Sequence, residues 1–312
     1  MSAVESISNV ARDESSVVTV GVFDGVHEGH RSILDHLLKR SAIRGGSSTV
    51  VTFDPHPREI VGPSPVSLLT TIKERADILG KMGIQRIVVI PFTKEFSQTS
   101  AEQFVVETLI DRIGMQEIVV GHDHHFGKGR QGNEKTLIEM ASENHFSVDV
   151  LPEKVLDRTV ISSSLIRNTI EREGNLELAS VYLGYRFGIT AEVIRGAGRG
   201  REIGFPTANL RPIHNQKIIP KNGVYAVTVH LGEHGDTYTG MMNIGFRPTF
   251  EVNDRHLEVH IIDLDEDLYG TNLRVEFVSR IRSEKKFEGI DALVEQLNED
   301  KVRCIASVKS MH

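Results

Sequence analysis

The sequence of 312 residues contains one cysteine, Cys304, and no tryptophan. A single cysteine excludes an intrachain disulfide and agrees with a reducing compartment. Long apolar runs are also lacking, since "IVVIPF" from Ile87 has only the length of a strand. The N-terminal "MSAVESISNVARDESS" lacks the basic start and apolar stretch of a signal peptide, and we expect a loose tail there. These absences predict a cytoplasmic protein without a membrane partner.

Positive charge is scarce as well. Lysine and arginine number 36 against 43 aspartates and glutamates, which gives a net charge of -7. Nucleic acid is therefore not an expected partner, because its binding needs a broad basic surface. An anion can still bind locally, at a helix N-terminus supported by a few cations. With 39% hydrophobic residues, the chain is long enough for two domains and a substantial core.

The first half alternates between strand-like and helix-like segments. Short β-branched runs cover 17–22, 48–53, 86–90, 117–120 and 147–150, and segments with helical spacing cover 30–43, 71–82, 100–113 and 133–145. This alternation predicts an α/β domain with a Rossmann-like parallel sheet covered on both faces. Ligands of such sheets bind at the carboxyl ends of the strands.

The second half has a different pattern after Ser180. We expect strands near 186–195, 222–231, 237–244, 256–262 and 272–280, followed by a helix near 288–300. Strands at this spacing predict an antiparallel barrel or sandwich, which the last helix would close. The change of pattern predicts two domains, at 17–184 and 185–312.

The first candidate site is "GVFDGVHEGH", which directly follows the first expected strand. A helix is expected to begin within it, so that His30 lies in the first turn and His27 just before it. The exposed N–H groups and the dipole of that turn favour an anion, and imidazoles can donate hydrogen bonds to phosphate oxygens. Gly21 and Gly25 allow the backbone to approach a bulky ligand closely.

A second segment, "ISSSLIR" (161–167), supports an anion site. Its serines lie at an expected helix start, where they could cap the helix or donate to phosphate, and Arg167 follows one turn later. A metal site is the alternative, because aspartate and histidine also suit zinc, iron and manganese. Its candidate ligands are Asp24, His27, His30, Asp54, His56, His122, Asp123, His124 and His125. The run "HDHH" cannot aim all of its side chains at one ion.

Together these motifs resemble nucleotidylyltransferases that hold ATP phosphates with His-x-Gly-His. "VTFDPHP", "FSQTSAEQFV" and "VVGHDHHFGKGRQG" narrow the resemblance, over about 17–184, to the adenylyltransferase module of bacterial bifunctional riboflavin kinase/FAD synthetase. The resemblance implies that the phosphate of FMN attacks the α-phosphorus of ATP, which yields FAD and pyrophosphate, with Mg²⁺ on the polyphosphate. It assigns phosphate contacts to His27, His30, Ser163, Ser164 and Arg167, and ATP or flavin contacts to Gly21, Phe23, Asp24, Gly25 and Asp123.

This sequence departs from the adenylyltransferase pattern at two positions. Ser164 stands where threonine is common, which keeps the hydroxyl group, and His125 stands where arginine is frequent.

The second candidate site begins with "GAGRGREIGFPTANL" (196–210). Its glycine spacing is not that of a dinucleotide fingerprint, and Pro206 argues against a following helix. The chain also has no P-loop motif. The remaining interpretation is a glycine-rich flap whose backbone, with Arg199 and Arg201, could lie over a phosphate chain. A mobile hairpin without function is the alternative for this segment alone.

Two further features favour a phosphate-transfer site. Thr207 and Asn209 alternate along an extended segment, so both can face one side and offer hard oxygen ligands to magnesium. Glu258 lies among apolar neighbours on an expected strand, on the same face as His260. A carboxylate inside a barrel is costly unless it is paired or used, although glutamates more often lie on a solvent face.

These strings, with "NGVYAVTV", "MMNIGFRPTF", "LEVHIIDLDEDLYG" and "LRVEFVSRIRSEKKF", resemble riboflavin kinase over about 187–300. The resemblance implies that Thr207 and Asn209 bind Mg²⁺ and that Glu258 is the general base. The base would act on the riboflavin 5′-hydroxyl as it attacks the γ-phosphorus of ATP. The resemblance also implies that loop 196–204 covers ATP and that Gly245 shapes the site; Gly196, Arg199 and Gly204 belong to that loop.

The leading hypothesis is one chain that makes FMN from riboflavin and FAD from FMN, with ATP as co-substrate and Mg²⁺. A metal-dependent hydrolase with a β-barrel binding module is the alternative, which tightly bound zinc or iron would favour. A chain with one active half is a third hypothesis. Whether the chain forms a homo-oligomer is left open.

Overall fold

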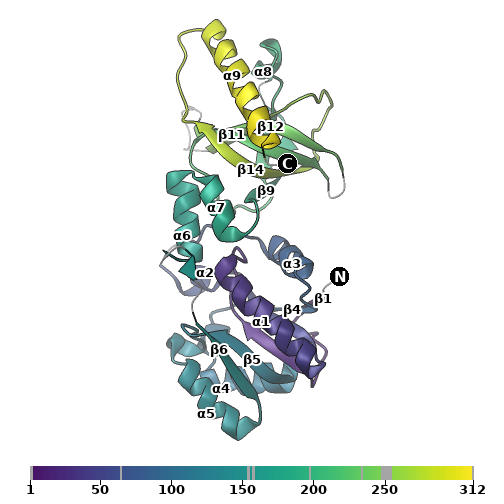
Figure 1. Cartoon of the computed structure of the whole chain (residues 1–312), viewed down its shortest axis with the longest axis vertical. Coiled ribbons are helices and arrows are strands. Elements are labelled where there is room, and N and C mark those ends of the chain that lie inside the picture. The colour runs from purple at the N-terminus through teal and green to yellow at the C-terminus, as the bar shows by residue number, and fades with distance from the viewer. Residues whose placement is uncertain are drawn as a thin grey trace. The chain divides into compact units, whose positions relative to one another are not determined.

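The computed structural model describes residues 3–63, 65–152, 155–156, 159–196, 198–232, 235–246 and 255–310. The chain divides into two compact units, Met1–Ser163 and Ser164–His312 (Figure 1). Each unit has a sheet and a core of its own, and each is described by itself. No helix in the described part of the chain combines the length and apolar character needed to cross a bilayer.

The first unit is built on a six-stranded sheet with the order β1-β4-β3-β2-β5-β6. All neighbouring strands are parallel. The strands are β1 (Ala3–Ser6), β2 (Ser16–Val20), β3 (Ser48–Asp54), β4 (Arg86–Pro91), β5 (Met115–Gly121) and β6 (Ser147–Leu151). The five expected strands and the parallel sheet are thus confirmed, with β2 fully buried near the centre.

The expectation of a loose N-terminal tail was wrong. Residues of β1 pair in parallel with β4, beginning with Ala3 opposite Arg86, so that β1 is the edge strand of the sheet. The guanidinium of Arg86 donates to the Glu5 carboxylate over 3.0 Å, and this bond lowers the pKa of Glu5. The polar segment gains order because an unpaired sheet edge offers it backbone partners.

Helices cover both faces of this sheet. Adjacent residues of each strand point to opposite faces, so that Val17 and Val50 join one core while Val18 and Val51 join the other. The first core packs under α1 (Glu28–Arg44) and α3 (Ile72–Lys81), and the second under α5 (Glu134–Asn144) and the π-helix η2 (Phe104–Ile113), which continues α4 (Ala101–Gln103). The smaller elements are α2 (Pro57–Val61), η1 (Phe96–Gln98), η3 (Lys128–Arg130), β7 (Val155–Leu156) and β8 (Thr159–Val160).

The second unit is a closed antiparallel barrel preceded by helices. The strand order is β10-β13-β12-β11-β14-β9. The helices are α6 (Ser163–Asn168), η4 (Thr169–Glu173) and α7 (Leu176–Leu183), and the strands are β9 (Gly188–Ile194), β10 (Ala208–Pro212), β11 (Gly223–Leu231), β12 (Thr237–Phe246), β13 (Arg255–Ile261) and β14 (Asn272–Arg282). Of the two expected architectures the barrel is therefore the observed one, and β10 adds a sixth strand.

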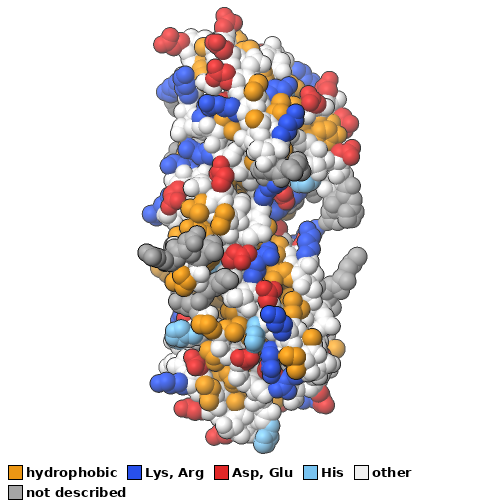
Figure 2. Space-filling model, in the orientation of Figure 1, with side chains coloured by type: hydrophobic (Ala, Val, Ile, Leu, Met, Phe, Trp, Pro, Cys, Tyr) orange, Lys and Arg blue, Asp and Glu red, His pale blue; other side chains and the backbone are white. Residues whose placement is uncertain are grey.

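Two further helices differ from expectation. The glycine-rich segment contains one helical turn, α8 (Arg199–Glu202), and the C-terminal helix α9 (Ile290–Lys309) continues well beyond residue 300. On α9, Cys304 and Val308 pack against the barrel core. On the face seen in Figure 2, acidic, basic and apolar side chains are interspersed.

Candidate active sites

The loop between β2 and α1 is tightly wound. Phe23, Gly25 and Val26 have positive φ angles of 52°, 85° and 38°. Side chains seldom adopt this conformation, so a glycine at position 25 removes strain. The Phe23 ring is buried and meets the His30 ring edge-on, with 5.1 Å between centroids. A Cβ on Gly21 would lie 3.1 Å from the Phe23 ring, so that glycine also makes room for it.

Asp24 supports this loop from the protein side. Its buried carboxylate accepts hydrogen bonds from the backbone N–H groups of Leu69, over 3.0 Å, and Thr70, over 2.8 Å. The Arg75 guanidinium, itself buried, lies 3.9 Å away. Because these bonds face the interior, Asp24 holds the loop in place, and a direct contact of Asp24 with ATP or flavin stays a prediction.

The two histidines of the loop stack on one another at the start of α1. His27 is the N-cap residue and His30 lies in the first turn, as expected, with 3.6 Å between ring centroids and 19° between planes. Burial, together with His27 and Arg75, holds the pKa of His30 well below its ordinary value. Nδ1 of His30 has no hydrogen-bond partner in the described part of the chain. An arriving polyanion would meet the neutral imidazole of His30 beside the positive end of a helix dipole.

The serine segment lies against this loop. The Ser163 hydroxyl donates to the backbone carbonyl of Asp24 over 3.0 Å, and the carbonyl of Ile161 is 3.1 Å from where a Cβ on Gly29 would be. The structure thus brings Ser163 of "SSS" to the loop that carries the two histidines. Ser164 and Arg167 follow in α6, after the division between the units, and their contacts with ATP stay predictions.

The side chains of the histidine-rich loop after β5 lie in different environments. His122, Asp123 and His125 are exposed, whereas His124 stacks on Phe126 with 5.7 Å between centroids. Burial lowers the pKa of His124 to about 4, so this imidazole is neutral at ordinary pH. Among the residues that the structure describes, no three histidine, cysteine or acidic side chains gather as a metal site.

An aromatic cluster at the carboxyl end of β3 and β4 was missed by sequence reasoning. The half-buried rings of Phe53, Phe92 and Phe96 meet one another with centroid distances of 5.5, 6.1 and 5.6 Å. Phe53 in "VTFDPHP" lies at a strand end, which is the signal that could have pointed to it. Such a cluster offers apolar contact for a flat ring system.

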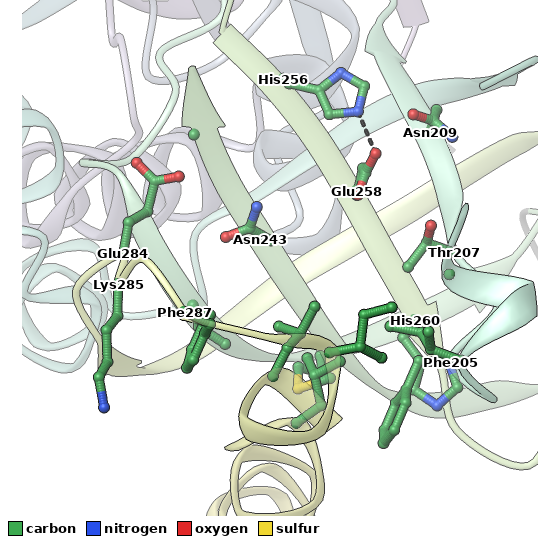
Figure 3. A pocket seen from close by; sticks show the side chains of 18 of the residues that line it. Phe205, Thr207, Asn209, Asn243, His256, Glu258, His260, Glu284, Lys285 and Phe287 are labelled. Carbon is green, nitrogen blue, oxygen red and sulfur yellow. Dashed lines mark hydrogen bonds and ion pairs between the residues drawn. The ribbon is translucent and has the colours of Figure 1, made fainter. Parts of the chain in front are cut away.

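The second unit contains a cavity of about 800 Å³. Residues of five adjacent strands, β10, β13, β12, β11 and β14, line it together with the segment before β10, the segment after β14 and α9 (Figure 3). Its polar lining includes Thr207, Asn209, Asn243, His256, Glu258 and His260. The alternation expected for Thr207 with Asn209, and for Glu258 with His260, therefore does bring these pairs to one cavity.

Glu258 lies in the middle of a polar row across the barrel wall. It is directly opposite Asn209 on β10 and opposite Asn243 on β12. His256, which sequence reasoning did not single out, lies two residues earlier on the same face, with Nε2 2.5 Å from Oε1 of Glu258. Both side chains are 24% exposed, so the carboxylate is held by the protein yet open to the cavity.

Asn209 has the properties of a ligand for a hard cation. Its side chain is 5% exposed, and Oδ1 has no hydrogen-bond partner within the described ranges. A buried amide oxygen without a partner is costly, which favours a bound group at this atom. A Cβ on Gly196 would lie 1.9 Å from Nδ2 of Asn209, so only glycine leaves room for this side chain. With the Thr207 hydroxyl nearby in the cavity wall, the donor set fits magnesium.

Comparison with known proteins assigns each half of the chain to a protein family. Residues 9–165 match the FAD synthetase family, and residues 183–308 match the riboflavin kinase family. A Bacillus subtilis protein named bifunctional riboflavin kinase/FMN adenylyltransferase is 36% identical over 296 residues, 93% of this chain and 92% of the relative. The Escherichia coli K12 protein of the same name is 34% identical over 305 residues, 97% of this chain and 96% of the relative.

The chain belongs to the bifunctional riboflavin kinase/FMN adenylyltransferase family. A solved structure named macrolide-efflux protein, from Streptococcus pneumoniae, matches it with a TM-score of 0.86 at 29% identity, over 96% of this chain and 97% of that one. Family membership makes the chain a transferase with two activities. It phosphorylates riboflavin to FMN and adenylylates FMN to FAD, and ATP is the substrate of both reactions.

In the riboflavin kinase half, the remaining predicted residues are Gly204, Arg199 and Gly245. Gly204 follows α8 with φ of 80°, and the side chain of Arg199 lies outside what the structure describes. Gly245 lines the cavity on β12, and a Cβ there would lie 1.9 Å from Oε1 of Glu284. Because Gly245 has no side chain, the Glu284 carboxylate can lie beside it at the cavity wall.

Proposed function

We propose that riboflavin is phosphorylated in the barrel cavity with Glu258 as the general base. The riboflavin 5′-oxygen bonds to the γ-phosphorus of ATP, the bond from that phosphorus to the β–γ bridging oxygen breaks, and ADP leaves. The hydroxyl proton passes to Glu258. The observation that carries this proposal is the row of Asn209, Glu258 and Asn243 on the cavity wall. A carboxylate suffices as base because the loose transition state asks for little early deprotonation.

Thr207 and Asn209 would hold Mg²⁺ together with the phosphates of ATP, and the buried Oδ1 of Asn209, which has no hydrogen-bond partner among the described residues, supports this role. When bound, the ion neutralises charge on the phosphates. We assign the ATP-covering flap to the glycine-rich segment with Gly196, Arg199 and Gly204. The apolar side of the cavity, formed by Phe205, Met241, Phe287, Leu293 and Leu297, would accept the isoalloxazine ring.

We propose that FMN is adenylylated beside the start of α1. An oxygen of the FMN phosphate bonds to the α-phosphorus of ATP, the bond from that phosphorus to the α–β bridging oxygen breaks, and pyrophosphate leaves. The stacked His27 and His30 at the helix N-terminus support this location. No protein nucleophile is needed, since positioning and charge neutralisation suffice. The further residues assigned to this site are Gly21, Phe23, Asp24, Gly25, Asp123, Ser163, Ser164 and Arg167.

The domain limits and the cellular setting also belong to this proposal. We assign residues 17–184 to the adenylyltransferase domain and 185–312 to the kinase domain; α6 and α7, which end the first range, fall in the second compact unit. A cytoplasmic enzyme that binds no nucleic acid is supported by the single cysteine and the net charge of -7.

The test is a time course with riboflavin, ATP and magnesium, in which flavins are separated by chromatography. Glu258→Gln and Asn209→Ala should each lower FMN production by about 100-fold or more, while FAD synthesis from supplied FMN continues. His30→Ala should do the reverse, because it removes a phosphate contact of the other site. A Glu258→Gln protein that phosphorylates riboflavin at the wild-type rate would refute the base assignment.

A further inference from the structure

His256 is a cavity residue to which the proposed reaction assigns no role. It shares one face of β13 with Glu258 and His260, and all three side chains line the cavity. Its Nε2 lies 2.5 Å from Oε1 of Glu258, a contact drawn as the dashed line in Figure 3. Because a carboxylate can only accept, the imidazole is the donor in this hydrogen bond.

The register of the barrel leaves this imidazole room to reach Glu258. His256 is opposite Gly245 on β12, and that glycine brings no side chain into the row. The space beside Gly245 is taken by the Glu284 carboxylate, whose Oε2 accepts a hydrogen bond from the Asn222 side chain over 3.3 Å. Glu258, by contrast, is flanked by the side chains of Asn209 and Asn243 on the neighbouring strands.

We propose that His256 is a positioning residue for the kinase reaction. Its Nε2–H donates to Oε1 of Glu258 and helps to fix the plane in which the carboxylate accepts the proton of the riboflavin 5′-hydroxyl. This inference rests on the proposed role of Glu258 as the base. The last torsion of a glutamate is soft, so a carboxylate that loses this donor samples more orientations that cannot accept that proton. A fixed donor removes this freedom before the substrate binds.

The experiment compares steady-state riboflavin phosphorylation by the full-length chain and its variants. His256→Ala should lower kcat by about tenfold, with the KM for riboflavin within about twofold of wild type, because orientation rather than affinity is lost. His256→Gln should recover most of the rate, since the glutamine amide can donate from nearly the same place. FAD synthesis from supplied FMN should be unchanged, and urea unfolding of the same preparations should show that the barrel is folded as stably as in the wild type.

His230→Ala is the matched control. His230 also faces a glutamate across the barrel wall, with Nε2 3.6 Å from Glu276, and its Nδ1 lies 2.9 Å from the Thr237 hydroxyl. It is absent from the cavity lining, so its loss should leave kcat at the wild-type value.

Three results would overturn the role of His256. They are a His256→Ala kcat within twofold of wild type, an equal loss in His256→Ala and His256→Gln, and a change in KM alone. Glu258→Gln separates this inference from the proposed function. If that variant keeps the wild-type kinase rate, the base assignment itself fails, whatever the His256 variants do.

Discussion

At the scale of single residues, the proposed kinase site depends on two glycines, whose lack of a side chain leaves room for polar neighbours. Gly196 leaves room for the Asn209 amide and Gly245 leaves room for the Glu284 carboxylate, each at a spot where a Cβ would lie 1.9 Å from a polar atom. Neither glycine has a positive φ, so the reason for glycine at both positions is space and not backbone conformation. Substitutions here should therefore act through the displaced neighbour.

Gly196→Ala is the direct test of this view. The new Cβ would displace Asn209 or the flap, and we expect riboflavin phosphorylation to fall by about tenfold or more and to need more magnesium. FAD synthesis from FMN should be unaffected. Gly289→Ala is the control, because a Cβ at position 289 meets nothing within 4 Å and φ is -169°. Wild-type kinase activity in Gly196→Ala would contradict the steric argument.

Sequence reasoning could place some of these residues but not their partners. Strand alternation correctly brought Asn209 and Glu258 to the lining of one cavity, because it needs only local backbone geometry. It could not predict that the two residues are opposite one another, since that depends on which strands become neighbours. For the same reason it could not predict that Asp24 faces Leu69 and Thr70 inside the protein.

At the scale of elements, α9 completes the wall of the kinase cavity. Ile290, Leu293 and Leu297 of this helix line the cavity, and an ion pair connects the helix to β14. The Arg282 guanidinium donates to both oxygens of Asp300, over 3.1 and 2.8 Å. The Asp300 side chain is fully buried, so this pair is shielded from water and salt.

Asp300→Ala should loosen this helix. Removing one partner leaves the Arg282 charge poorly compensated, and we expect the free energy of unfolding of the barrel to fall by about 3 kcal/mol. The KM for riboflavin should rise because part of the apolar wall is less well placed. Urea unfolding and kinase kinetics measure the two effects, with Glu299→Ala, an exposed neighbour on α9, as the control. Unchanged stability in Asp300→Ala would show that α9 is held by its apolar face alone.

Elements with strong periodicity were the predictable ones. The run 86–90 became β4 (Arg86–Pro91) because β-branched residues of a buried strand are recognisable without their neighbours. β1 was missed because "AVES" carries little apolar signal and is ordered through pairing with β4. The π-helix η2 was read as an ordinary helix, since the same apolar spacing suits both hydrogen-bond patterns.

At the scale of the whole molecule, the two activities belong to two units with separate cores. The proposed sites lie around the start of α1 in the first unit and in the cavity between the barrel wall and α9 in the second. Because FMN is the product of one site and the substrate of the other, we expect it to reach the second site by way of the solvent. A chain defective at one site should then be complemented by a chain defective at the other.

Mixing Glu258→Gln with His30→Ala tests this expectation. Neither variant alone should make FAD from riboflavin, since the first produces no FMN and the second does not adenylylate it. The mixture should make FAD after a lag during which FMN accumulates, and the lag should shorten as the protein concentration rises. The control is FMN supplied to each variant, which only Glu258→Gln should convert. If both single variants keep their remaining activity but the mixture makes no FAD, FMN is not released from the kinase site, and transfer within one chain must replace diffusion.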